Sequence, residues 1–237
     1  VRVWDAFSGE CENVLSKHRD WVRYAIFNPK GDRIASASSD NTIILWNAKT
    51  GEYITTLYGH SAPVMSVNFD PTSKRLVSSS WDKTIIVWNA EGGYQLGHCK
   101  AHKKEVYYTE FNLDGTKIVS CSDDKTFYVW NSETLQYESS WKEHSNYVNS
   151  AVFSPDGNSL ATASSDRTIR IWDLNTKECV KALGGHKNWV NSVRYHPNGN
   201  ALVSASDDKT IKVWTSGDGL VLEEVNEFKQ EFEDGDF

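Results

Sequence analysis

The chain of 237 residues contains little of what several protein classes require. No apolar run approaches the roughly 20 residues that a membrane-spanning helix needs, so membrane insertion is not expected. No basic stretch leads into an apolar segment at the start of the sequence, so no signal peptide is expected. The 25 lysines and arginines face 32 aspartates and glutamates, and this net charge of −7 argues against charge-driven binding to nucleic acid.

Cysteine is also scarce. The four cysteines, Cys11, Cys99, Cys121 and Cys179, form no CxxC motif and no cluster with histidine, so neither a disulfide scaffold nor a metal site is indicated. Glycine-rich phosphate-binding loops are absent as well. We therefore expect reduced thiols in an intracellular protein, in the cytoplasm rather than the nucleus, that carries no metal and no cofactor.

Aromatic residues, by contrast, are abundant and regularly spaced: ten Trp, ten Tyr and nine Phe accompany a single Met. Six tryptophans, beginning with Trp4, recur every 42 residues, and five histidines, serines and aspartates keep the same interval. Counted from each histidine, the serine stands at position 20, the aspartate at 22 and the tryptophan at 28. The five sets are His18, Ser38, Asp40 and Trp46; His60, Ser80, Asp82 and Trp88; His102, Ser122, Asp124 and Trp130; His144, Ser164, Asp166 and Trp172; and His186, Ser206, Asp208 and Trp214.

Each 42-residue unit has the pattern of four short β-strands. Apolar residues recur with a period of two rather than 3.6, and turn sequences such as Asn28-Pro29-Lys30-Gly31 separate the runs. One such unit is too small to bury two apolar faces, so it must stack on copies of itself. Radial stacking of four-stranded antiparallel blades is a β-propeller, and this all-β class is the predicted fold.

The unit resembles the WD-repeat (WD40) family, over nearly all of residues 1–225. The resemblance rests on the unit length, on Gly-His at the start of some units (Gly59, Gly185) and on Trp-Asp at the third strand (Asp5, Asp173). Other units replace that glycine by Lys17, Ala101 or Glu143, and that aspartate by Asn47, Asn89, Asn131 or Thr215. The histidine, serine, aspartate and tryptophan are untouched by these departures. The resemblance implies a propeller that binds proteins or peptides.

The repeat also indicates domain boundaries. Residues 1–17 correspond to the third and fourth strands of a partial blade, and residues 18–225 to five complete blades. Residues 226–237 have no repeat and form an acidic tail. We expect the two absent strands of the partial blade to lie upstream in a propeller of seven blades, as in many family members. The tail is predicted to be solvated, with docking to a partner or to a neighbouring blade as the alternative.

Serine, histidine and aspartate together suggest either the catalytic triad of a hydrolase or a structural hydrogen-bond network. A triad requires an exposed nucleophile and an oxyanion hole, and no GxSxG motif is present. Because the set occurs five times at one spacing, always with tryptophan, a hydrogen-bonded structural tetrad explains it better. The resemblance implies the same tetrad. His98 and His196 stand outside it and have no second metal ligand nearby in sequence.

A candidate binding surface follows from the first strand of each unit. The residues five, seven and nine positions after histidine share one parity, but the valine at position four also has a buried character, so a β-bulge is predicted between them. The bulge would project the residues at positions three, five and 21 on one face. These are Trp21, Arg23, Ser39, Pro63, Met65, Trp81, Glu105, Tyr107, Asp123, Tyr147, Asn149, Ser165, Trp189, Asn191 and Asp207.

Tryptophan, tyrosine and arginine are the residue types enriched at interface hot spots, so this surface predicts partner binding. We expect a non-catalytic scaffold that assembles other proteins and is itself a subunit of a larger complex. The alternative is a reader of a short or modified peptide, such as a histone tail, at the mouth of the central channel. A propeller-based hydrolase is the third hypothesis; it would need carboxylates or metal ligands converging on that channel.

Overall fold

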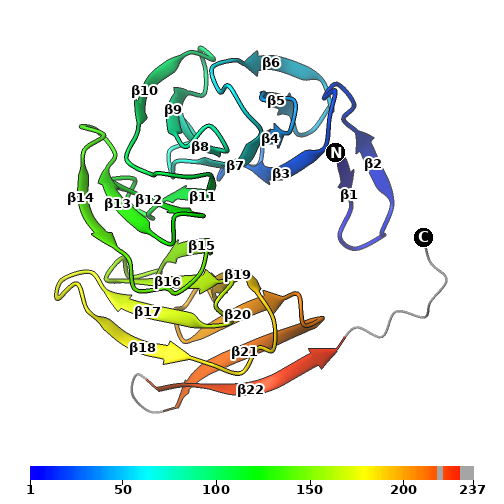
Figure 1. Ribbon diagram of the computed structural model, residues 1–237. Coiled ribbons are helices and arrows are strands. Elements are labelled where there is room, and N and C mark those ends of the chain that lie inside the picture. The colour runs from blue at the N-terminus through cyan, green and yellow to red at the C-terminus, as the bar shows by residue number, and fades with distance from the viewer. Residues whose placement is uncertain (218–220, 230–237) are drawn as a thin grey trace. The chain divides into compact units, whose positions relative to one another are not determined.

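The computed structural model describes residues 1–217 and 221–229. Every regular element in those ranges is a β-strand, and none is a helix. No described helix could therefore cross a membrane. One two-stranded sheet is followed by five four-stranded antiparallel sheets, each formed by strands consecutive in sequence (Figure 1). The predicted all-β class, built of four-stranded blades of the propeller type, is confirmed.

We number the sheets as blades 1 to 6 in chain order. The chain divides into two compact units, residues 1–141 with blades 1–4 and residues 142–237 with blades 5 and 6. The strands of the first unit are β1 (Arg2–Trp4), β2 (Cys11–Val14), β3 (Val22–Phe27), β4 (Arg33–Ser38), β5 (Ile43–Asn47), β6 (Tyr53–Leu57), β7 (Val64–Phe69), β8 (Arg75–Ser80), β9 (Ile85–Asn89), β10 (Gln95–Cys99), β11 (Val106–Phe111), β12 (Lys117–Ser122), β13 (Phe127–Asn131) and β14 (Tyr137–Trp141).

The second unit contains two complete blades. Its strands are β15 (Val148–Phe153), β16 (Ser159–Ser164), β17 (Ile169–Asp173), β18 (Cys179–Leu183), β19 (Val190–Tyr195), β20 (Ala201–Ser206), β21 (Thr210–Gly217) and β22 (Val221–Lys229). The repeat spacing ended the last blade at residue 225, but β22 pairs with β21 as far as Lys229. Four residues assigned to the acidic tail therefore belong to this sheet. The rest of the tail, residues 230–237, lies outside the described residues.

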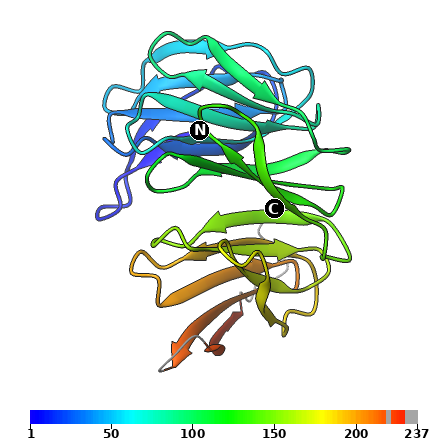
Figure 2. The ribbon, with the colours of Figure 1, turned by 90° about the vertical axis from the view of Figure 1, so that its left-hand side faces the viewer.

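In blades 2 to 5 the second and third strands carry the core, because both of their faces are covered. In blade 6, by contrast, Val203 and Ile211 are 41% and 45% exposed. In blade 2, β5 has the sequence IILWN and buries its first four residues, although their side chains alternate between the two faces. Neighbouring strands of one blade run in opposite directions (Figure 2). The outer strand of each of blades 2 to 5 is mostly exposed but ends on a buried residue. At that position in blade 4, Trp141 is buried and stacks on Phe127 with ring centroids 4.7 Å apart.

Adjacent blades within a unit are joined by polar contacts as well as by apolar packing. Arg33 of blade 2 donates to the carbonyl of Ala90 in blade 3 at 2.9 Å. Arg75, one repeat later, donates to the carbonyl of Gly115 in blade 4, also at 2.9 Å. The arginine at this repeat position therefore links blade 2 to blade 3 and blade 3 to blade 4.

Every complete blade contains the predicted β-bulge in its first strand. The register shifts between Val22 and Tyr24, and the same shift follows the corresponding valine in the other four blades. The residue inside the shift is the one five positions after histidine, such as Arg23. A bulge places two residues opposite one, so the direction of the residue after the valine is not fixed by the valine, which is buried in blades 3 to 6 and 39% exposed in blade 2.

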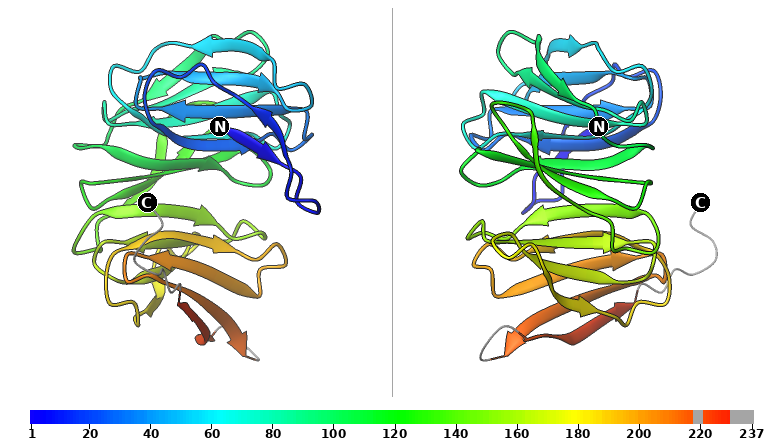
Figure 3. Two further views of the ribbon diagram at one scale, coloured as in Figure 1. Left: turned by 90° about the vertical axis from the view of Figure 1, so that its right-hand side faces the viewer. Right: turned by 60° about the vertical axis from the view of Figure 1, so that its left-hand side comes forward.

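Blade 1 is a hairpin of β1 and β2 that lies beside blade 2 (Figure 3). Val3 and Leu15 are buried in a cluster with Ile34 and Trp46 of blade 2. Trp4 itself is 53% exposed. The hairpin is therefore held by its packing on blade 2, whereas its own tryptophan remains in contact with solvent.

Candidate functional site

A hydrogen-bonded relay of four side chains crosses each complete blade. The histidine Nδ1 lies 2.7–3.2 Å from an oxygen of the predicted aspartate in all five blades. The histidine Nε2 lies 2.7–2.8 Å from a hydroxyl oxygen on the second strand. The tryptophan indole N–H donates to the same hydroxyl at 2.8–2.9 Å.

The hydroxyl in this relay is not the predicted one. It belongs to Ser36, Ser78, Ser120, Thr162 and Ser204, which stand two residues before the predicted serines. Assigning Ser38, Ser80, Ser122, Ser164 and Ser206 to the tetrad was therefore wrong. Positions two apart in a strand face the same side, so parity could not separate the two columns.

The predicted serines have a different role at the end of the second strand. Ser80 donates to the backbone carbonyl of Ala62 at 3.0 Å and accepts the backbone N–H of Asp82 at 3.0 Å. Each of the other four makes the same two contacts. These serines fix the turn that presents the aspartate, and they do not touch the histidine ring.

A threonine that the sequence analysis missed completes each relay. Thr42, two residues after Asp40, donates its hydroxyl to Oδ1 of Asp40 at 2.6 Å and its backbone N–H to the same oxygen at 3.0 Å. Thr84, Thr126, Thr168 and Thr210 repeat both bonds. Its constant place, 24 residues after histidine, is a signal that the sequence offered.

The aspartates are held as carboxylates. Burial alone would raise the pKa of Asp40. Hydrogen bonds from Thr42, from the backbone N–H of Arg19 and from the His18 side chain outweigh this effect and lower the pKa to about 2. The pKa of Asp82 is also lowered, because bonds from His60 and Thr84 outweigh its burial. An ionised aspartate accepts from Nδ1–H, so Nε2 is the acceptor for the hydroxyl proton, and a neutral imidazole satisfies every group.

Serine, histidine and aspartate do meet, but not as a hydrolytic site. The relay hydroxyls of Ser36, Ser78, Ser120, Thr162 and Ser204 are all 0% exposed. A nucleophile must reach its substrate, and each of these oxygens is already paired with both an indole and an imidazole. The relay ties the second and third strands to the segment that enters the blade, so its role is structural.

The predicted face residues are paired within every complete blade. The backbone N–H of the residue before the aspartate donates to the carbonyl three positions after histidine, at 2.8–3.0 Å. The pairs are Ser39 with Trp21, Trp81 with Pro63, Asp123 with Glu105, Ser165 with Tyr147, and Asp207 with Trp189. The bulged residue joins them in three blades, because Arg23, Asn149 and Asn191 donate to the side chains of Ser39, Ser165 and Asp207.

In the first unit these pairs bring together three residues of hot-spot types, two tryptophans and one arginine. The Arg23 guanidinium lies 4.9 Å from the Trp21 ring centre and 5.9 Å from that of Trp81. Both distances are within the range of cation–π attraction. Trp21 is 71% exposed and Trp81 is 38% exposed. We call Trp21, Arg23 and Trp81 the aromatic–arginine cluster; it spans blades 2 and 3 and faces solvent.

The remaining face residues differ in exposure. Trp189, Asn191 and Asp207 of blade 6 are exposed. The predicted face residues of blade 4, Tyr147 and Asn149 of blade 5 and Met65 of blade 3 are half-buried, and Ser165 of blade 5 is buried. In blade 4 an ion pair of 3.3 Å joins Lys104 to Asp123. Convergence of all the face residues from the two units on one surface stays a prediction.

The histidines outside the relay are exposed. His98 lies on β10 and His196 in the turn between β19 and β20. Across the described ranges, no three histidine, cysteine, aspartate or glutamate side chains are grouped as metal ligands. All four cysteines are free thiols, with Cys99 and Cys121 buried.

Five stretches of the chain match the family model described as WD domain, G-beta repeat. They are residues 9–47, 51–89, 93–131, 135–173 and 177–215. Each stretch begins before the outer strand of one blade and ends with the third strand of the next. No curated protein matches the chain.

Proposed function

Because the chain belongs to the family of WD-repeat (WD40) proteins, we propose that it is a non-catalytic scaffold whose blade face binds partner proteins. The family's repeats form an interaction fold, and its members are generally non-catalytic scaffolds. Assembly of a multiprotein complex in the cytoplasm is the finer part of this proposal. The observation that supports partner binding by the blade face is the aromatic–arginine cluster.

The cluster has the physical properties of a binding hot spot. Two exposed indoles and a guanidinium supply apolar area together with hydrogen-bond donors. The Nε of Arg23 is bonded to Ser39 at 2.7 Å, which orders the side chain before any partner arrives. A partner therefore meets a surface with little side-chain entropy left to lose. A carboxylate on that partner would suit the guanidinium, which sits among neutral rings.

Affinity purification with the full chain as bait, followed by mass spectrometry, identifies the partner. Trp81→Ala and Tyr107→Ala should each weaken its binding by roughly 1–3 kcal/mol while leaving the melting temperature nearly unchanged. Tyr94→Ala is the matched control, because Tyr94 is 57% exposed but lies at the opposite end of β9 from Trp81.

Two results would contradict the proposal. One is normal partner binding by the Trp81 and Tyr107 variants together with a lowered melting temperature, which would make these residues structural. The other is an equal loss of binding in Tyr94→Ala. A partner held by a modified peptide alone would instead favour the peptide-reading hypothesis.

A further inference from the structure

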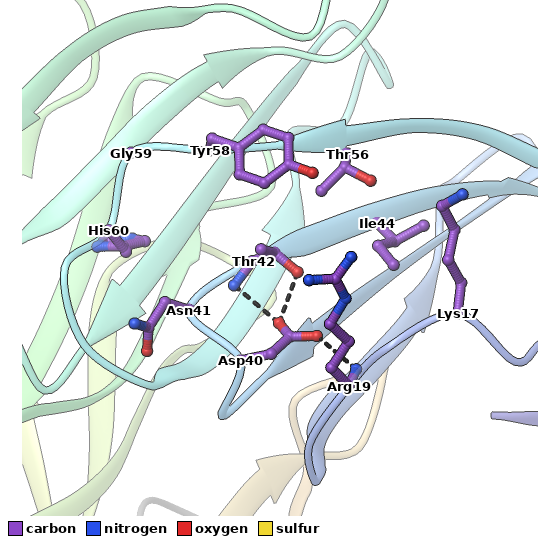
Figure 4. A pocket seen from close by; sticks show the side chains of 10 residues that line it. All are labelled: Lys17, Arg19, Asp40, Asn41, Thr42, Ile44, Thr56, Tyr58, Gly59 and His60. Carbon is purple, nitrogen blue, oxygen red and sulfur yellow. Dashed lines mark hydrogen bonds between the residues drawn. The ribbon is translucent and has the colours of Figure 1, made fainter.

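A pocket of about 340 Å³ opens in blade 2, beside the relay of His18 and Asp40. Its lining comes from three parts of the chain: the segment that enters the blade, the turn between β4 and β5 with the start of β5, and the outer strand β6 with the residues that follow (Figure 4). The polar side chains facing it include Lys17, Arg19, Thr42, Thr56 and Tyr58. The Arg19 guanidinium lies between Thr42 and Ile44, on the side where the Tyr58 hydroxyl points.

Several hydrogen-bond donors of this pocket are available to a ligand. Among the described residues, neither the Arg19 guanidinium nor the Tyr58 hydroxyl has a hydrogen-bond partner. The Lys17 ammonium lies 3.8 Å from the ring centre of Tyr53, a contact that orients it but leaves its N–H groups available. Asp40 is the acid in the lining, and its oxygens already accept bonds from His18, the Arg19 backbone and Thr42.

Other blades do not reproduce this arrangement. Only blade 2 has cations both before and after the relay histidine; the equivalent pairs are Gly59 and Ser61, Ala101 and Lys103, Glu143 and Ser145, and Gly185 and Lys187. The position of Ile44 also differs in blades 4, 5 and 6, although blade 3 keeps an isoleucine there, Ile86. In blade 4 it is Tyr128, whose ring packs 4.7 Å from His102, and in blade 5 it is Arg170, 3.4 Å from Glu143. A larger side chain thus occupies that position in both blades.

We propose that the blade 2 pocket binds a phosphomonoester through Arg19, Lys17 and Tyr58. A phosphomonoester carries close to two negative charges near neutral pH, which matches two cations, and its oxygens accept several hydrogen bonds. Arginine suits it because the guanidinium can donate two parallel bonds. The pocket is larger than a phosphate group, so it also has room for part of the molecule that carries it. The suggestion that this molecule is a peptide rests on the proposed function. The binding of the phosphate group itself does not.

The test is a titration of the full chain with inorganic phosphate, followed by the Nε–Hε NMR signals of its arginines. Chloride at matched ionic strength is the reference. We expect a saturable shift of the Arg19 signal, which Arg19→Gln identifies by its loss. Lys17→Gln should weaken phosphate binding by about tenfold, the effect of removing one charge-assisted hydrogen bond. Lys103→Gln is the matched control, because Lys103 follows His102 as Arg19 follows His18, and its backbone N–H binds Asp124 in the same way.

Phosphate shifts equal to those in chloride, or equal weakening by Lys103→Gln, would overturn the proposal. O-phosphoserine and phosphoserine peptides, each compared with its dephosphorylated form, then distinguish the source. A phosphopeptide that binds more tightly than O-phosphoserine indicates a peptide ligand, and equal binding indicates a small phosphorylated molecule; both support the pocket. Trp81→Ala should bind inorganic phosphate normally, so failure of the partner-binding proposal would be seen separately.

Discussion

Trp4 of blade 1 and Trp88 of blade 3 occupy the same place in the repeat, but their surroundings differ. Trp88 is 1% exposed and its indole N–H donates to Ser78, whereas Trp4 is 53% exposed on a two-stranded sheet. The guanidinium of Arg2 lies 5.9 Å from the Trp4 ring centre. The conserved spacing therefore does not bury a tryptophan by itself. Burial requires a second strand that supplies both apolar cover and a hydroxyl.

The largest expected effect comes from truncating the two tryptophans. Trp88→Ala should lower the free energy of unfolding by about 3–5 kcal/mol, the usual cost of emptying a large core site. Trp4→Ala should cost less than about 1 kcal/mol, because surface substitutions rarely cost more. Urea unfolding of each variant, followed by circular dichroism, measures the difference. Similar losses in both variants would show that blade 1 is as well packed as blade 3.

A smaller effect is expected from removing the relay hydroxyl. In blade 3 the indole of Trp88 donates to this hydroxyl, whereas the indole of Trp4 has no such partner among the described residues. Ser78→Ala leaves the indole of Trp88 and the imidazole of His60 without their shared partner. It should cost roughly 1–3 kcal/mol of unfolding free energy. Ser78→Thr is the control, because Thr162 fills this position in blade 5 with the same two contacts. If the alanine and threonine variants melt alike, the hydroxyl does not stabilise the blade.

The smallest expected effect is a pH dependence carried by the relay aspartates. Hydrogen bonds hold the pKa of Asp82 below its usual value near 4, despite its burial. A carboxyl with a lowered folded-state pKa stabilises the fold above about pH 4, and that contribution is lost as the pH falls further. The slope is at most about 1.4 kcal/mol per pH unit for each buried carboxyl.

Urea unfolding between about pH 5 and pH 3 tests this dependence, with the window set by the usual aspartate pKa. Asp82→Asn should reduce the loss of stability on acidification. Asp5, in the turn of blade 1, is half-buried, and hydrogen bonds from Ser8 and Phe7 lower its pKa as well. Asp5→Asn should change the pH profile less than Asp82→Asn does. A larger change in the Asp5 variant would contradict the assignment of acid sensitivity to the complete blades.

Much of the fold could be predicted because the repeat marks every blade at the same places. The interval of 42 residues indicated the four-stranded blades, and conflicting parity in the first strand indicated the bulge that all five blades contain. The end of β22 could not be predicted, because no further histidine or tryptophan of the repeat marks it. The acidic composition there concealed a strand that reaches Lys229.

The site was predicted in part, and the errors have identifiable causes. The relay hydroxyl was placed at the invariant serine column, whereas the true column contains Thr162, whose hydroxyl is chemically equivalent. The spacing indicated that Trp21, Arg23 and Trp81 lie on one face, but their distances also depend on how blades 2 and 3 pack together. The pocket of blade 2 was missed because it depends on Lys17 and Arg19 together with a small residue at Ile44, where blades 4 and 5 carry Tyr128 and Arg170. Such a difference has no consequence until the blade is folded.

The bulge in each first strand has a consequence for protein engineering. At this position the register shifts, and the five blades carry four different types of side chain there: Arg23, Met65, Tyr107, Asn149 and Asn191. The preceding valine is buried in four of the five blades. A bulge lets one side chain change without changing the pairing of the strands around it. A combinatorial library confined to the five bulge positions should therefore alter ligand selectivity, and most of its members should still fold.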